Sequence, residues 1–256
     1  MREVVDLNSD LGEGGEHDEA ILELVTSANI ACGFHAGDPA SVFGSICAAK
    51  EWGVATGAHP SLADRENFGR TENDISVSDA FTLVTYQIGA FKALCAAAGT
   101  EMNHVKPHGA LYNMAARNSA LAHAIAHAVL AVDARLILFV PARSAMEIAA
   151  VELELQTARE VFADRNYMPD GSLVPRTRPD ALLHDPVEAA ERVVRMLREG
   201  VVRAVDGSDV PIEVETICVH GDTPEAVGFV RELRRRLESE SVMIAPPARR
   251  RCTGMI

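Results

Sequence analysis

The chain alternates between short apolar runs that end in polar residues and longer segments in which apolar residues recur every three or four positions. The first pattern is typical of strands buried in a parallel sheet, and the second of amphipathic helices. The predicted strands are Val4–Asn8, Asn29–Cys32, Val54–His59, the segment ending in His104–Pro107, Leu136–Val140, Arg159–Ala163 and Thr216–His220.

Helices are expected between these strands. They are predicted over 16–25, 39–52, 76–98, 111–131 with a break near Asn118, 144–153 and 186–198, with a last one that begins at Thr223–Glu225. Asp38 is expected to cap the second of them. A small hairpin is expected over 201–214, and the polar connections 61–73 and 164–185 are long enough to be functional.

Strand and helix therefore alternate about seven times, which indicates a parallel sheet. Polar residues at the carboxyl ends of the strands favour a closed barrel with its active site at that end, and we expect residues 1–256 to form a single domain. A doubly wound open sheet is the alternative. That fold often carries a glycine-rich phosphate loop, and neither GxGxxG nor GxxxxGK[ST] occurs in this sequence.

Composition narrows the classes of function. The 256 residues carry a net charge of −13, which argues against nucleic acid or an anionic membrane as a partner. The five cysteines include no CxxC pair, and we expect free thiols in a reducing cytoplasm, with Cys32 and Cys218 in the core. We recognise no secretion signal and no apolar run long enough to span a membrane, and we expect a cytoplasmic protein.

Side chains that carry protons or bind cations gather at the predicted strand ends. Four of the nine histidines occupy equivalent places in the repeating unit, with carboxylates between them, which indicates a shared site. The candidates are Asn8, Asp10, Glu13, His35, Asp38, His59, Lys106, His108, Glu160, Asp164, His220 and Asp222. Asp6 lies on the same face of its strand as Asn8 and is interpreted as a residue that braces the barrel.

Lys106 follows an apolar strand and precedes Pro107, so its backbone is expected to be extended. It could be ion-paired with Asp10 or Glu160, or it could stabilise an oxyanion or a phosphoryl oxygen. The sequence leaves both open.

Asp10 and Glu13 are candidates for general base and general acid, provided that their surroundings separate their pKa values. Asp10, His35 and His59 could equally hold a divalent metal ion that activates water. Dispersed ligands of this kind are weak evidence in a sequence, and whether a metal is bound stays open.

Several of these segments resemble the LamB/YcsF family. The matching stretches, which together span nearly the whole chain, are Asp6–Glu13, Ser27–Pro39, Gly57–Ser61, Phe68–Arg70, Val105–Asn113, Glu160–Arg165 and Val219–Pro224. The resemblance implies a distorted seven-stranded β/α barrel similar to that of polysaccharide deacetylases. It also implies ATP-dependent cleavage of the lactam of 5-oxo-L-proline to L-glutamate, in a complex with two further 5-oxoprolinase subunits. Because no phosphate-cradling loop is recognised, we expect the ATP site on a partner.

Three hypotheses follow. The first is that the chain is a component of 5-oxoprolinase, which is a hydrolase acting on a cyclic amide. Its catalytic candidates are Asp10, Glu13, His35, Lys106 and His108, and its candidates for substrate binding and orientation are Asn8, His59, Glu160, Asp164, His220 and Asp222. The second is a stand-alone metal-dependent deacetylase or amidase, with Asp10, His35 and His59 as ligands. The third is a barrel that binds a small metabolite and regulates a partner.

Overall fold

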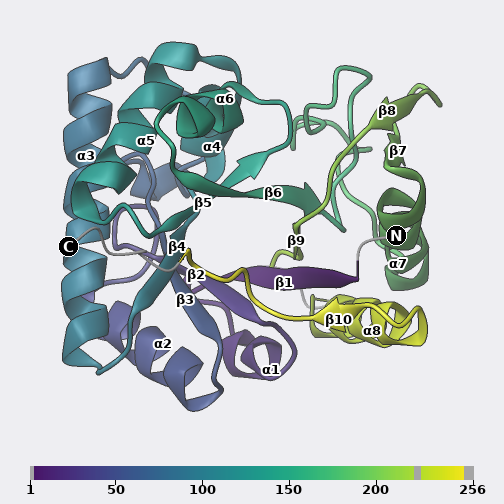
Figure 1. Ribbon diagram of the computed structural model, residues 1–256, viewed down its shortest axis with the longest axis horizontal. Coiled ribbons are helices and arrows are strands. Elements are labelled where there is room, and N and C mark those ends of the chain that lie inside the picture. Colours follow the sequence, from purple (N-terminus) through teal and green to yellow (C-terminus); the bar gives the residue numbers. More distant parts are fainter. Residues whose placement is uncertain (1–2, 222–225, 251–256) are drawn as a thin grey trace.

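A closed barrel of seven parallel strands forms the centre of the computed structural model, which describes residues 3–221 and 226–250 (Figure 1). The strands are β1 (Val4–Leu11), β2 (Ser27–Ala31), β3 (Ala55–His59), β4 (Met102–Val105), β5 (Ile137–Pro141), β6 (Gln156–Phe162) and β9 (Thr216–Cys218). Neighbours follow chain order from β1 to β6, and β9 pairs with both β6 and β1, which closes the ring. The barrel expected from the sequence is confirmed.

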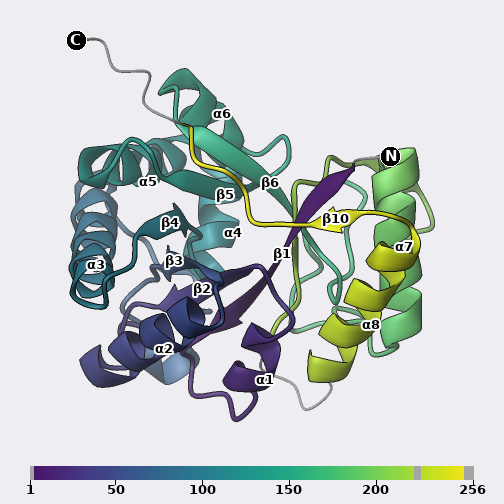
Figure 2. The ribbon, with the colours of Figure 1, turned by 60° about the horizontal axis from the view of Figure 1, so that its bottom comes forward.

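Helices surround the barrel, as the two ribbon views show (Figures 1 and 2). They are α1 (Asp18–Leu22), α2 (Pro39–Glu51), α3 (Val77–Ala97), α4 (Gly109–Arg117), α5 (Ser119–Val132), α6 (Ala145–Glu152), α7 (Pro186–Glu199) and α8 (Ala226–Ser239), with a 3-10 turn, η1 (Arg65–Asn67), in the loop after β3. Helix α3 packs against α5, and α7 packs against α8. The expected hairpin is formed by β7 (Val201–Arg203) and β8 (Asp209–Pro211).

Some elements differ from their expected bounds. Strand β1 continues beyond Asn8 because Asp10 and Leu11 still pair with β2, so Asp10 lies within the strand. The first helix shrinks to the five residues of α1. A two-residue strand that was not expected, β10 (Met243–Ile244), pairs with the start of β1. The predicted break near Asn118 is confirmed, because its side chain accepts a hydrogen bond from the Leu121 N–H and caps α5.

Helix α3 has 21 residues and contains an 18-residue window with a mean hydropathy of 1.3, values that by length and composition alone would suffice for a membrane span. Its inner side, with Val84, Ile88 and Phe91, belongs to the main hydrophobic core. A buried face of this kind is typical of a helix that packs on a barrel, since the apolar residues are needed to cover the strands.

The barrel interior has a polar side and an apolar side. Asp6, Asn8 and Asp10 share the inner face of β1, because successive side chains of a strand point to opposite faces. All three are buried. The apolar side is a small separate cluster of buried residues on β5 and β6, namely Ile137, Phe139 and Ala158.

Asp6 links β1 to its two neighbours in the barrel. Its carboxylate accepts hydrogen bonds from the hydroxyls of Thr26, Ser27 and Thr216 at 2.7, 2.8 and 2.5 Å. Burial raises the pKa of Asp6 to about 6, and the hydroxyl donors only partly offset this effect. Its position supports the interpretation of Asp6 as a residue that braces the barrel.

The raised pKa of Asp6 predicts a pH-dependent contribution to stability. The folded carboxyl titrates near pH 6 and the unfolded one near 3.8, so the unfolded chain loses this proton first as pH rises. We therefore expect the free energy of unfolding of the protein, relative to that of Asp6→Asn, to fall by about 2 kcal/mol between pH 4 and pH 7. Denaturant unfolding of both proteins at each pH measures this difference.

Asp133→Asn is the matched control for this experiment. Hydrogen bonds from Arg135 hold the pKa of Asp133 well below its usual range. The free energy of unfolding of the protein relative to that of Asp133→Asn should therefore change by less than about 0.5 kcal/mol over the same pH interval. The prediction would be contradicted if the free energy of unfolding of the protein relative to that of Asp6→Asn stayed constant or rose between pH 4 and pH 7.

Candidate active site

Lys106 lies just beyond β4, with only 2% of its surface exposed. Its Nζ is 2.8 Å from Asp10 Oδ1 and 2.9 Å from Glu160 Oε1, so it pairs with both carboxylates that the sequence suggested. Burial alone would lower the pKa of Lys106, but the charges of Asp10 and Glu160 hold it well above its usual range. Lys106 is therefore a permanent cation that joins β1, β4 and β6.

Asn8 orients this ion pair from the neighbouring position on β1. Its Nδ2 donates to Glu160 Oε1 at 3.1 Å and to Thr216 Oγ1 at 2.6 Å. Its Oδ1 accepts hydrogen bonds from Asn29 at 2.7 Å and from Lys106 at 3.5 Å. Every polar atom of the Asn8 side chain is thus engaged, and the residue acts as a fixed junction in the barrel wall.

Glu13 and three histidines form a second cluster beside Asp10. Glu13 Oε1 lies 2.9 Å from His35 Nε2, 3.2 Å from His108 Nδ1 and 3.7 Å from His59 Nε2. Asp10 Oδ2 lies 3.4 Å from His59 Nε2, which connects this cluster to the ion pair. The structure therefore brings together five residues that the sequence placed at four strand ends.

The outer nitrogens of two of these rings face backbone carbonyls. His59 Nδ1 lies 2.6 Å from the carbonyl oxygen of Lys106, and His108 Nε2 lies 2.8 Å from that of Phe68. A carbonyl only accepts hydrogen bonds, so both outer nitrogens carry a proton. The inner nitrogens then face each other at 2.9 Å, and both face Glu13. This arrangement requires a proton or a cation between them.

The surroundings of these groups separate their pKa values. Burial alone would raise the pKa of Asp10, but the charges of His59 and Lys106 hold it well below its usual range. Burial lowers the pKa of His35 to about 4 and also lowers that of His108, so both are neutral at pH 7. Burial would lower the pKa of His59 too, but the charge of Asp10 raises it. His59 therefore binds a proton more readily than the other two rings.

Asp164 and His220 form a pair next to the ion pair. Asp164 Oδ2 lies 2.8 Å from His220 Nδ1, and the imidazole stacks on Phe162. Potential ligand atoms of Asp10, Cys218 and His220 all lie within 4.8 Å of one another, so this pair adjoins the main cluster. Of the other candidates, Asp222 lies outside the described residues.

Asp38 serves the helix that follows it. Its Oδ1 accepts hydrogen bonds from the N–H groups of Ala40 and Ser41, both at 2.9 Å, and forms the cap of α2 that the sequence predicts. The residue is exposed and contacts none of the clustered histidines in the described structure. It therefore belongs to the loop that supports His35.

Sequence reasoning did not assign a role to four residues near the site, namely Asn29, His104, Tyr112 and Cys218. Cys218 was expected in the core and is buried there, yet its Sγ lies 3.0 Å from Lys106 Nζ. The Tyr112 hydroxyl lies beside the Glu160 carboxylate, and burial together with this neighbour holds the pKa of Tyr112 well above its usual range. Tyr112 is therefore a protonated donor next to the carboxylate that pairs with Lys106.

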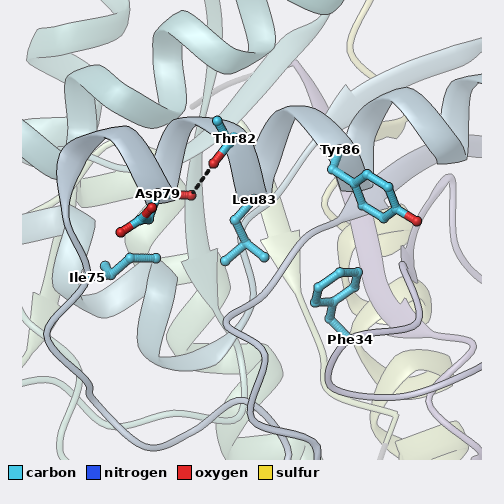
Figure 3. A pocket seen from close by; sticks show the side chains of 6 residues that line it. All are labelled: Phe34, Ile75, Asp79, Thr82, Leu83 and Tyr86. Carbon is cyan, nitrogen blue, oxygen red and sulfur yellow. Dashed lines mark hydrogen bonds between the residues drawn. The ribbon is translucent and has the colours of Figure 1, made fainter.

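An apolar hollow of about 520 Å³ lies on the outer side of the loop that carries His35. Figure 3 shows Phe34 from this loop facing Tyr86 on α3, with Leu83 next to them and Ile75 at the other end of the hollow. The two aromatic rings meet edge to face, with centroids 5.9 Å apart. Helix α3 thus supports the backbone immediately before His35.

Comparison with known proteins extends over nearly the whole chain. The Bordetella pertussis protein named as the A subunit of 5-oxoprolinase is 48% identical over 249 residues, which cover 95% of this chain and 99% of that protein. The protein of the same name from Methylococcus capsulatus is 50% identical over 251 residues, which cover 96% of this chain and 96% of that protein.

Solved structures are also similar to this chain over nearly its whole length. The lactam utilization protein from Thermus thermophilus has a TM-score of 0.88 and 42% identity, covering 96% of this chain and 99% of that one. A family 4 carbohydrate esterase from Streptomyces lividans has a TM-score of 0.51 at 10% identity, covering 94% and 91%, and shares the fold alone. Residues 5–252 match the family model described as LamB/YcsF, and the chain belongs to the LamB/YcsF family.

Proposed function

We propose that this chain is the A subunit of an ATP-dependent 5-oxoprolinase and that it opens the lactam ring of 5-oxo-L-proline to give L-glutamate. Relatives that share about half of its residues are named as that component of 5-oxoprolinase. The observation that carries the proposal is the buried cluster of Asp10, Glu13, Lys106 and three histidines inside the barrel. Such a cluster supplies the charge and proton transfers that amide cleavage needs.

Opening the lactam requires three contributions from the site. A carboxylate, Asp10 or Glu13, takes a proton from the attacking water as its oxygen bonds to the lactam carbon. Lys106 stabilises the negative charge that develops on the lactam oxygen or on a phosphoryl group attached to it. His59, which carries a proton, delivers it to the ring nitrogen as the C–N bond breaks. His35 and His108 orient Glu13 and relay protons.

The remaining candidates hold and orient the substrate in this proposal. Asn8 and Glu160 fix Lys106, while Asp164 orients His220. Asp222 follows the same strand end in the sequence and keeps its proposed role in substrate binding. Tyr112 lies beside Glu160 and helps to hold that carboxylate next to Lys106.

We place the ATP site on one of two partner subunits in the cytoplasm, because the sequence contains no glycine-rich phosphate loop. The partner transfers the γ-phosphoryl group of ATP to the lactam oxygen and releases ADP. Water then adds to the activated carbon, the C–N bond breaks to free the amine, and a second water cleaves the resulting acyl phosphate to glutamate and phosphate. The charge of Lys106 suits each of the phosphorylated species.

Reconstitution tests this proposal. We expect glutamate release from 5-oxo-L-proline only when the chain is combined with its partner subunits and ATP. Within that complex, Asp10→Asn should lower kcat by roughly 10²- to 10⁴-fold, because it removes the candidate base and the charge that holds His59 protonated. Measuring glutamate and ADP in the same assay gives the rate of lactam cleavage and the rate of ATP hydrolysis.

The matched control is Asp74→Asn, at an exposed aspartate in the loop before α3, which should leave kcat unchanged. Circular dichroism of Asp10→Asn separates lost chemistry from lost folding. Complete lactam cleavage by the chain alone, without ATP, would overturn the multi-subunit proposal.

A metal-dependent amidase or deacetylase acting alone is the second candidate function. Potential ligand atoms of Glu13, His35, His59 and His108 lie within 4.8 Å of one another, and the inner nitrogens of His59 and His108 already face Glu13. These residues fit a divalent cation, with Glu13 and His108 in place of the Asp10 suggested by the sequence. A bound divalent cation would lower the pKa of a water molecule and polarise the amide carbonyl.

Metal analysis separates the two candidates. A metal-dependent amidase predicts about one equivalent of zinc or manganese in protein purified without chelator, as expected for a site with three or four protein ligands. Glu13→Gln and His59→Ala should lose that equivalent, while His123→Ala, at a histidine with an ion pair on the outside of α5, should keep it. Metal-free chain that supports full activity in the ATP-dependent complex would exclude this alternative.

A further inference from the structure

Four positions on adjacent strands form a row across the polar side of the barrel. Asp10 on β1 pairs with Asn29 on β2, Asn29 with Gly57 on β3, and Gly57 with His104 on β4. A Cβ atom at position 57 would lie 2.1 Å from His104 Nε2. The imidazole therefore crosses β3 in the space that the missing side chain leaves, and reaches Asn29 Oδ1 at 2.8 Å.

The direction of the hydrogen bonds in this row is determined by their partners. Asn29 Nδ2 lies 2.8 Å from Asp10 Oδ1 and 2.7 Å from Asn8 Oδ1. The first of these is a carboxylate oxygen, and the second belongs to an amide whose nitrogen already donates elsewhere. The Asn29 nitrogen must therefore face them, and its oxygen must face His104. The reverse orientation would bring three oxygens together without a proton.

His104 consequently donates from Nε2, and its surroundings support that state. The ring is fully buried and stacks on Phe139 at a centroid distance of 4.2 Å. Burial lowers the pKa of His104 to about 3, so the ring is neutral and carries a single N–H. Its Nδ1 has no hydrogen-bond partner among the described residues, as expected for the bare nitrogen of this tautomer.

This row of side chains determines which oxygen of Asp10 accepts hydrogen bonds from the barrel wall and which one points toward the histidines. Oδ1 accepts hydrogen bonds from Asn29 and from Lys106, both at 2.8 Å. Oδ2 accepts no hydrogen bond from either residue and lies 3.4 Å from His59 Nε2. One oxygen is thus anchored to the barrel wall, while the other is directed at the histidine cluster.

We propose that His104 is a positioning residue for the reaction, which acts through Asn29 to hold Asp10 with Oδ2 toward His59. His104 does not reach the reacting atoms itself. Without its N–H, Asn29 Oδ1 is left buried without its donor, and the amide loses the contact that holds its nitrogen in place against Asp10 Oδ1. The functional part of this inference rests on the proposed 5-oxoprolinase activity, while the contact across Gly57 does not.

Substitution of His104 tests the functional part in the reconstituted complex. His104→Phe keeps a flat ring on Phe139 but has no donor, and should lower kcat about 10- to 100-fold with KM changed less than about twofold. His104→Gln places an amide N–H near the same point and should recover kcat to within about threefold of the original protein. His127→Phe, at an exposed histidine on α5, should leave both parameters unchanged.

Three outcomes of this assay are decisive. An unchanged kcat in His104→Phe would overturn the inference, and so would a glutamine variant as impaired as the phenylalanine variant. Absence of ATP-dependent glutamate release in the unsubstituted complex would instead count against the proposed function.

A stability cycle tests the contact across Gly57 without any activity assay. Gly57→Ala should shift the denaturant midpoint downward because its Cβ collides with the His104 ring. In a His104→Ala background the collision is absent, so the same substitution should cause a clearly smaller shift. Equal shifts in the two backgrounds would show that the ring does not cross β3 as described, and would overturn the inference.

Discussion

A single buried ammonium group makes this barrel interior possible. Lys106 pairs with both Asp10 and Glu160 where all three groups are removed from water. Leaving a buried charge without its partner costs roughly 3–5 kcal/mol, so the two carboxylates depend on that one side chain. Asn8, Asn29 and the histidine cluster are arranged around the resulting ion pair. The cation thus serves folding and chemistry at once.

The protons of the site are distributed by two different physical effects. Burial lowers the pKa values of His35, His104 and His108, while the charge of Asp10 raises that of His59. The ring with the raised pKa is the best proton donor among them. Because each outer nitrogen of His59 and His108 is bound to a backbone carbonyl, the rings also keep their orientation.

Periodicity favoured a barrel over an open sheet and placed His35, His59 and Lys106 at strand ends, because parallel strands bring those ends to one side. Glu160 lies within β6 instead. Periodicity could not predict that Glu13, rather than Asp10, stands closest to His35 and His108, since that depends on how the loop after β1 folds back. Nor could it reveal the contact between His104 and Asn29. These residues are two strands apart, and they meet only because the register places a glycine between them.

The pairing of β1 with β9 has a consequence for how the protein is made. Thr216 and Asp6, which this pairing joins, are separated by 210 residues, so nearly the whole chain must leave the ribosome before the ring can close. Until then, Asp10, Lys106 and Glu160 can remain hydrated, and none has to be buried without a partner. Desolvation of the charged groups is thereby postponed to the final step of assembly, when their partners are all present.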